Sequence, residues 1–246
     1  MSILDDVSQN LSLVRYGYQV LPHSKRHSFY ELKEEFEDFL CRNLLSFGAT
    51  SLDGFTAEQY HKFIELNNLD HHQFIQQYKR EIPTNIRNHD YISQLVDEIS
   101  THIEKRLRIY DDRIEFRCCR PKKEDNNPWH RDHWFPYFEN LLNVYLPISG
   151  SYVDSSLQIV PFSHKWTEEE CVPTFPYEPE KNHKTSKDGL KFSVPEIKEC
   201  SRELKGHRFD IIPGNYAIFS PKSVHGSGNN HSNETRFSFE FRLESY

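Results

Sequence analysis

The stretch that decides the fold runs from residue 215 to residue 243 and reads NYAIFSPKSVHGSGNNHSNETRFSFEFRL. Its first six residues form a short apolar run that indicates a strand, and the Pro221-Lys222 pair after it indicates a turn. Its last nine residues alternate, with Arg236, Ser238, Glu240 and Arg242 on one face and Phe237, Phe239 and Phe241 on the other. One face of this second strand is therefore expected to pack in a sheet interior.

The loop between these strands carries His225, and a second histidine lies far upstream beside a carboxylate. Residues 129–138 read WHRDHWFPYF, so His130 stands two residues before Asp132. On an extended segment, residues i and i+2 point to the same side, and both side chains could reach one metal ion. Two histidines and one carboxylate are typical ligands of a mononuclear iron site. Without His225, a surface turn that happens to hold His130 and Asp132 would explain the triplet equally well.

An arginine follows the second histidine at a distance that suits a neighbouring strand. Arg236 lies eleven residues after His225, and its planar guanidinium can pair with a carboxylate beyond the metal. An oxo-diacid bound to the metal would present such a carboxylate. Most strand arginines are exposed, and we expect that of Arg242.

Three blocks in the second half of the chain carry a family resemblance. They read HRDHWFP (130–136), SSLQIVPFSHKW (155–166) and VHGSGNNHSNETR (224–236). In their order and in the histidine-to-arginine spacing they resemble the phytanoyl-CoA dioxygenase family of Fe(II)/2-oxoglutarate oxygenases. The resemblance covers about residues 114–243. Phe162 stands where the family usually has glycine.

The resemblance implies a cofactor, two co-substrates and the residues that bind them. The implied iron ligands are His130, Asp132 and His225. Arg236 would hold the distal carboxylate of 2-oxoglutarate, and Ser227 would form a hydrogen bond beside it. The sequence shows no motif for the inner carboxylate, and we take Arg117 and Asn143 as candidates. Dioxygen would be reduced as a small molecule is hydroxylated, and because halogenases of this superfamily lack the carboxylate ligand, Asp132 favours hydroxylation.

The spacing of apolar residues divides the chain into a helical and a β part. Residues 1–108 show stripes at spacings of three and four, and the candidate N-caps are Ser28, Thr56, Asp70 and Asp90. The first helix is expected to end near Gly48. Short strands are predicted over 113–120, 141–148, 155–160, 209–212, 215–220 and 235–243. The fold class is thus α+β: one domain over 1–246, a double-stranded β-helix (cupin-like jelly roll) over 109–246, flanked by N-terminal helices.

Residues 167–206 interrupt the β pattern with a stretch rich in Glu, Lys and Pro. Such a long insertion is typical of a lid over a site or of a surface loop, and we favour a lid. Basic residues precede the His130 motif, namely Arg117, Arg120, Lys122 and Lys123. They form either a solvated face or the approach for an anion. The expected substrate is a small polar molecule, anionic or sugar-like.

Composition narrows the functional classes. A net charge of −7 argues against a nucleic-acid partner. No apolar run approaches the length of a membrane span, and no signal peptide is recognisable, so no membrane partner is expected. Five cysteines without a CxxC spacing indicate reduced thiols and a cytoplasmic location.

The remaining histidines are expected to be structural. We expect solvated side chains for His71, His72, His133 and His231. We expect His164 to brace the turn after a strand or to line the entrance.

Two other functions remain open at this point. A cupin-type isomerase or binding module could hold a metal without redox chemistry. A zinc hydrolase could use His130, Asp132 and His225 with water in the fourth position, but it would leave Arg236 without a role.

Overall fold

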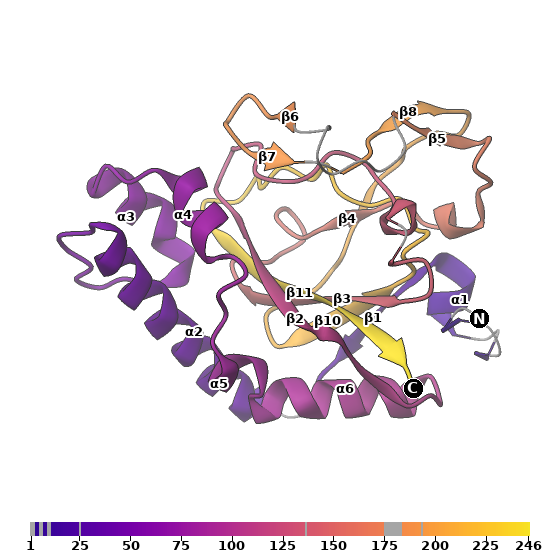
Figure 1. The fold of residues 1–246 in the computed structure, drawn as a ribbon, viewed down its shortest axis with the longest axis horizontal. Helices are drawn as coiled ribbons and strands as arrows, with labels where there is room; N and C mark the ends of the chain where they lie inside the picture. Colours follow the sequence, from indigo (N-terminus) through magenta and orange to yellow (C-terminus); the bar gives the residue numbers. More distant parts are fainter. Residues whose placement is uncertain are drawn as a thin grey trace.

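A five-stranded antiparallel sheet organises the chain in this computed structural model, which describes residues 3–4, 7–8, 11–24, 26–135, 137–174, 184–192 and 194–246 (Figure 1). The strand order is β1-β10-β3-β11-β2. In that order the strands span Tyr18–Pro22, Asn215–Phe219, Leu142–Ser149, Arg236–Ser245 and Leu107–Cys119. Every neighbouring pair is antiparallel, so strands from both ends of the chain meet in one sheet.

Short strands lie over one face of this sheet (Figure 1). β4 (Gln158–Ile159) pairs with β9 (His207–Arg208). Buried apolar side chains join these strands to the large sheet: Tyr145, Leu157, Ile159, Phe209, Ile211, Ala217 and Phe219. Two antiparallel layers around an apolar interior form a jelly roll, which confirms the predicted fold class.

Two further hairpins fall within the insertion over residues 167–206. β5 (Cys171–Pro173) pairs with β8 (Ile197–Cys200), and β6 (Lys184–Thr185) pairs with β7 (Lys191–Phe192). Residues 175–183 and 193 of the insertion lie outside the described residues. Its role as a lid stays a prediction.

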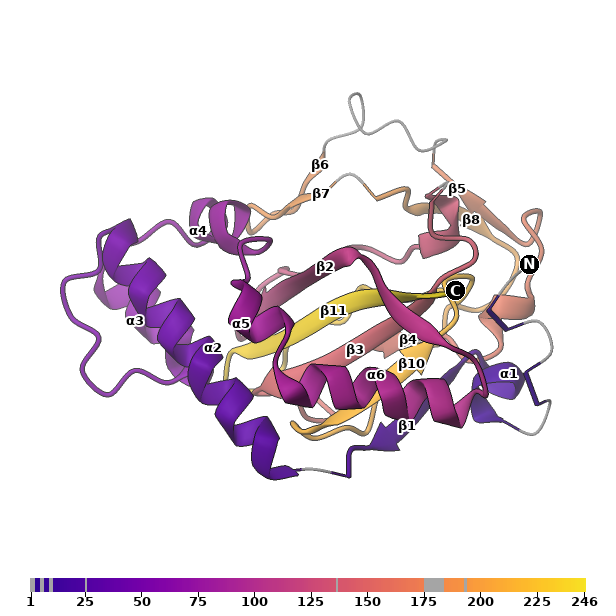
Figure 2. The same ribbon diagram turned by 60° about the horizontal axis from the view of Figure 1, so that its bottom comes forward.

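Helices cover the opposite face of the large sheet (Figure 2). The helices of this layer are α2 (Arg26–Phe47), α3 (Tyr60–Leu66), α4 (His71–Tyr78), α5 (Thr84–Arg87) and α6 (Asp90–His102), with the short 3-10 helix η1 (Ala57–Gln59). The remaining helices are α1 (Ser12–Tyr16), which precedes β1, and the short 3-10 helices η2 (Asp132–Trp134) and η3 (Ser163–Lys165), which lie in the loops after β2 and β4. In the described part of the chain, none of the helices is long and apolar enough to cross a membrane.

Aromatic contacts fix the helical layer on the sheet. The ring of Phe36 on α2 lies edge-on to Phe237 and Phe239 of β11, with centroid distances of 5.4 and 5.0 Å. The ring of Phe116 on β2 completes the cluster, with its centroid 5.5 Å from that of Phe36. The phenylalanine face of β11 is thus buried under helices, as the alternation predicts. Its polar face must point into the jelly roll.

The helix ends agree only partly with the predicted caps. The first helix predicted from the sequence is α2. It begins at Arg26 rather than after Ser28, and it ends where Gly48 takes a φ of 115°. Asp70 accepts a hydrogen bond from the Gln73 backbone N–H, which confirms that cap. Thr56 stands at the N-cap position of η1, as predicted, but its side chain makes no capping hydrogen bond.

The last predicted cap is also displaced. Asp90 lies inside α6, and the preceding His89 accepts from the Tyr91 backbone N–H through its ring Nδ1. A histidine ring can offer the same acceptor as an aspartate oxygen, but it is not a residue that cap statistics favour.

The strand predictions hold for the long runs and fail for short strands, since β5 to β9 were not predicted. Residues 209–212 form no strand, because Phe209 and Ile211 are buried in the interlayer core and the ladder lies just before them, in β9. β1 was not predicted; it ends in Pro22, as an edge strand can. Phe162, at the family's glycine position, takes the left-handed φ of 68° that glycine would adopt readily.

Candidate metal centre and polar cavity

Backbone hydrogen bonds join the segment that bears His130 to the segment that bears His225. The backbone N–H of His130 donates to the carbonyl of His225 at 3.1 Å, and that of His225 donates back at 3.0 Å. Ile159 of β4 forms a second bridge to His225. These contacts hold two segments, far apart in the sequence, side by side at one end of the jelly roll.

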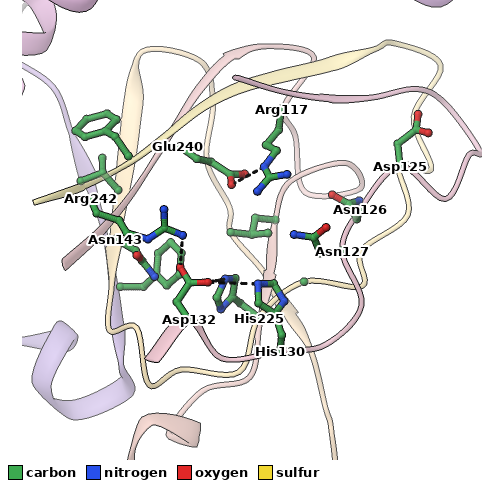
Figure 3. A pocket seen from close by; sticks show the side chains of 15 residues that line it. Arg117, Asp125, Asn126, Asn127, His130, Asp132, Asn143, His225, Glu240 and Arg242 are labelled. Carbon is green, nitrogen blue, oxygen red and sulfur yellow. Dashed lines mark hydrogen bonds and ion pairs between the residues drawn. The ribbon is translucent and has the colours of Figure 1, made fainter. Parts of the chain in front are cut away.

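Three side chains converge at this bridge (Figure 3). Asp132 Oδ1 lies 3.4 Å from His130 Nε2 and 3.7 Å from His225 Nε2. All three residues are buried, and one ligand atom from each lies within 4.8 Å of the others. Asp132 is at the start of η2, not on a strand, so the side chains lie together although the i, i+2 argument for an extended segment does not apply.

Backbone hydrogen bonds orient the imidazole rings of His130 and His225. The Nδ1 atoms of His130 and His225 lie 2.8 and 3.0 Å from the carbonyl oxygens of Pro128 and Ser223. A carbonyl only accepts, so each Nδ1 carries a proton, and Nε2 is the ring nitrogen that faces the other two side chains. Burial, with the neighbouring His130, lowers the pKa of His225 to about 4. This imidazole is therefore neutral at pH 7, as a metal ligand must be.

Asp132 is ionised in the same surroundings. Although burial opposes ionisation, the guanidinium of Arg242 holds the pKa of Asp132 well below its usual value. Arg242 Nη2 lies 2.7 Å from Asp132 Oδ2, and the Arg242 side chain is 26% exposed. The expectation of an exposed Arg242 is wrong, because alternation along β11 turns this residue toward the site. Two imidazole nitrogens and one carboxylate oxygen fit a divalent iron ion.

A polar cavity opens beside these three side chains (Figure 3). Its polar walls include Arg117, Asn126, Asn127, Asn143, Glu240 and Arg242. Arg117 Nε donates to Glu240 Oε2 at 3.1 Å, and this ion pair is about one-third exposed to the cavity, at 31% and 28%. Asn143 is buried, and neither atom of its amide has a hydrogen-bond partner among the described residues.

Arg236 lies behind the cavity wall. It is fully buried, and its guanidinium donates to the Ser155 carbonyl at 2.8 Å and to Asn126 Oδ1 at 2.9 Å, with Cys119 Sγ at 2.8 Å. Within the described residues, its Nε has no partner and no carboxylate lies within ion-pair distance. Asn126 lines the cavity and therefore stands between it and Arg236.

The other residues singled out in the sequence lie elsewhere. Among the described residues, Ser227 is exposed and does not line the cavity, and its backbone N–H donates to the Asn127 carbonyl. His164 Nε2 lies 3.0 Å from the Val14 carbonyl, so it braces the turn as predicted. Of the four basic residues before the motif, Arg117 alone lines the cavity.

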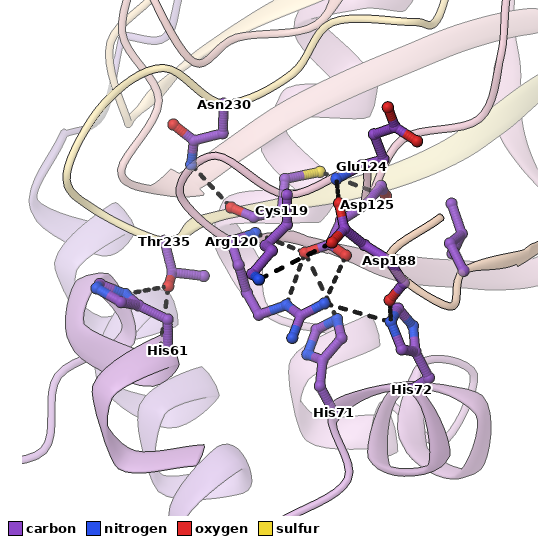
Figure 4. Close-up of polar contacts among 12 residues, drawn as sticks. His61, His71, His72, Cys119, Arg120, Glu124, Asp125, Asp188, Asn230 and Thr235 are labelled. Atoms are coloured by element: carbon purple, nitrogen blue, oxygen red, sulfur yellow. Dashed lines mark hydrogen bonds and ion pairs between the residues drawn. The ribbon is translucent and has the colours of Figure 1, made fainter. Parts of the chain in front are cut away.

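A second group of ligand-type side chains lies at the N-terminus of α4 (Figure 4). Arg120 donates to both oxygens of Asp125, at 2.8 and 2.9 Å, and its Nη2 lies 3.3 Å from His72 Nε2. The guanidinium already supplies the positive charge that a metal would bring. His71 is buried with Nδ1 3.1 Å from the Tyr60 hydroxyl, and burial lowers its pKa to about 3. The prediction of a solvated His71 is wrong: it is a neutral core histidine.

Sequence reasoning missed four polar residues of the cavity wall: Asn126, Asn127, Glu240 and Arg242. Glu240 and Arg242 share the polar face of β11 with Arg236, and that alternation is the signal that could have found them. Asn126 gave no signal, because its position depends on how a loop crosses the wall of the cavity.

Comparison with known proteins identifies the family of this chain. The family model "Phytanoyl-CoA dioxygenase (PhyH)" matches residues 31–238, and the chain therefore belongs to the phytanoyl-CoA dioxygenase family. Comparison with curated protein sequences gave no match.

Solved structures share the fold at low sequence identity. EctD from S. alaskensis, with 2-oxoglutarate and 5-hydroxyectoine, gives a TM-score of 0.57 at 14% identity, covering 95% of this chain and 74% of that one. EvdO2 from Micromonospora carbonacea var. aurantiaca, complexed with 2-oxoglutarate, gives a TM-score of 0.56 at 13% identity. The match covers 96% of this chain and 89% of that one. SnoK, a non-heme alpha-ketoglutarate-dependent carbocyclase from nogalamycin biosynthesis, gives a TM-score of 0.53 at 14% identity. The match covers 99% of this chain and 85% of that one. The protein thus belongs to the phytanoyl-CoA dioxygenase family and shares its fold with these oxygenase structures.

Proposed function

We propose that this protein is an Fe(II)- and 2-oxoglutarate-dependent dioxygenase that hydroxylates a small polar metabolite, with succinate and carbon dioxide as co-products. The observation that carries the proposal is the convergence of His130, Asp132 and His225 beside a polar cavity. Three protein ligands on one side leave the other side of an iron ion open to small molecules. Iron, 2-oxoglutarate and dioxygen together would supply the oxidising power needed to hydroxylate a C–H bond.

Arg236 is our candidate for the distal carboxylate of 2-oxoglutarate. Its buried charge meets only neutral acceptors in the described part of the chain, and a carboxylate would neutralise it. Asn126 would have to yield its hydrogen bond or share it, because it separates Arg236 from the cavity. The exposed position of Ser227 gives no support to a role beside this carboxylate.

For the inner carboxylate, Asn143 is a better candidate than Arg117. The Asn143 amide is buried and unpaired among the described residues, and its Nδ2 could donate to a bound carboxylate. Arg117 is already engaged by Glu240.

The charges around the cavity favour a hydrogen-bonding, sugar-like substrate over an anion. Arg117 pairs with Glu240 and Arg242 pairs with Asp132, so neither wall arginine brings an uncompensated charge. Paired charges and amides can both donate to and accept from hydroxyl groups.

Conversion of 2-oxoglutarate to succinate tests the proposed function. Purified protein with Fe(II), 2-oxoglutarate, ascorbate and oxygen should form succinate slowly without a second substrate. His225→Ala should abolish it, because one of three ligands is lost. His231→Ala, at an exposed histidine of the same loop, is the matched control and should retain the activity.

Three outcomes contradict parts of this proposal. Unchanged turnover in His225→Ala removes the assigned metal site. Tight metal binding by the wild type without any succinate supports the non-redox cupin alternative. A chlorinated product in chloride buffer contradicts hydroxylation, since Asp132 fills the position that chloride would need.

A further inference from the structure

Arg242 contacts the outer oxygen of the candidate carboxylate ligand (Figure 3). Asp132 Oδ1 is the oxygen nearer to both histidines, at 3.4 and 3.7 Å. Asp132 Oδ2 accepts a hydrogen bond from Arg242 Nη2 at 2.7 Å. The two oxygens of one carboxylate therefore face different partners.

Arg242 is held firmly in this position. It lies on β11, directly opposite Asn143 of β3 in the antiparallel register. Its guanidinium carbon lies 3.9 Å from the centroid of the Phe138 ring, within range of a cation–π contact. Strand and ring together limit the directions in which the guanidinium can point.

A carboxylate can bind a metal ion through one oxygen or through both. If both oxygens of Asp132 bound, one more position on the ion would be taken. The proposed reaction needs three positions outside the protein ligands, two for 2-oxoglutarate and one for dioxygen. A charge-assisted hydrogen bond on Oδ2 opposes binding through that oxygen.

We propose that Arg242 is a positioning residue that restricts Asp132 to binding the metal through Oδ1 and so keeps the 2-oxoglutarate positions free. This inference rests on the proposed function. Arg242 itself does not touch the metal.

Metal and co-substrate binding, measured separately, test the inference. Mn(II) binding is followed by electron paramagnetic resonance, and 2-oxoglutarate binding by the visible absorption of the anaerobic Fe(II) protein. Arg242→Met should bind Mn(II) within about threefold of the wild type but 2-oxoglutarate roughly tenfold more weakly, about 1.4 kcal/mol, because the second oxygen of Asp132 would compete for one of its positions. Its visible band should also shift.

Two further variants complete the experiment. Arg242→Lys should recover part of the 2-oxoglutarate affinity, because an ammonium supplies charge and one donor but not the planar fork. Arg108→Met is the matched control, since Arg108 pairs with Glu244 and its side chain is 63% exposed. It should match the wild type in both measurements.

The outcomes separate the two proposals. A wild-type protein that binds neither Mn(II) nor 2-oxoglutarate contradicts the proposed function. If the wild type binds both, an Arg242→Met protein with the same band and affinity overturns the positioning role alone. Loss of Mn(II) binding in that variant also overturns it, because Arg242 would then be required for the metal rather than for the free positions.

Discussion

Arg236 and Arg242 lie on the same face of β11, but their surroundings differ. Arg236 is fully buried among a carbonyl, an amide and a thiol, whereas Arg242 has a carboxylate partner and is partly exposed. A buried guanidinium without a counter-charge is unfavourable unless a ligand supplies one. This difference supports separate roles for the two arginines: Arg236 toward the co-substrate, and Arg242 toward Asp132.

Replacement of Arg236 tests the first role. Arg236→Lys should raise the apparent KM for 2-oxoglutarate by roughly tenfold or more, because lysine lacks the planar fork and each 1.4 kcal/mol changes affinity tenfold. The succinate assay measures this across a range of 2-oxoglutarate concentrations. Arg108→Lys, at the exposed arginine, should leave KM unchanged. Equal KM values in the two variants would refute the assignment of Arg236.

At the scale of elements, the site depends on how closely two chain segments approach. Gly226 follows His225 and takes a φ of 116°, and a Cβ there would lie 2.5 Å from the Pro128 carbonyl oxygen. That carbonyl is the acceptor for His130 Nδ1. A side chain at position 226 would therefore push the segment bearing His225 away from the segment bearing His130 and Asp132.

Gly226→Ala should consequently weaken Mn(II) binding and lower the free energy of unfolding. Gly54 is a matched control, because it has a φ of 72° but open space around its Cβ position. Gly54→Ala should lose about 1–2 kcal/mol from the left-handed backbone alone and keep its metal affinity. Thermal unfolding and Mn(II) titration measure both effects. Equal losses of stability with unchanged Mn(II) affinity would show that the close approach does not matter.

The sequence predicts an element well when neighbouring residues determine it, and poorly when a distant partner strand determines it. The alternation of β11 and the stripe of α2 are local patterns, and both are confirmed. The cap at Asp70 is also local. β1 and the break after Arg208 depend on which distant strand offers a partner, and no local pattern encodes that.

Over the whole molecule, the topology assembles the site from three distant regions. β2 with the loop and η2 after it supplies Arg117, His130 and Asp132. β3 supplies Asn143, and β11 with the loop before it supplies His225, Glu240 and Arg242. The residue types and the spacing of the three converging side chains were readable from the sequence. The Arg117–Glu240 pair was not, because in the β2–β11 register Arg117 stands opposite Ser238 and the ion pair runs diagonally.

The absorption spectrum of the anaerobic protein tests the central claim most directly. Fe(II) and 2-oxoglutarate added together to the wild type should produce a weak visible band that neither gives alone, because the co-substrate binds to an iron ion held by His130, Asp132 and His225. The same additions to folded His225→Ala should give no band. A folded wild-type protein that binds Fe(II) and yet shows no band with saturating 2-oxoglutarate would contradict the account.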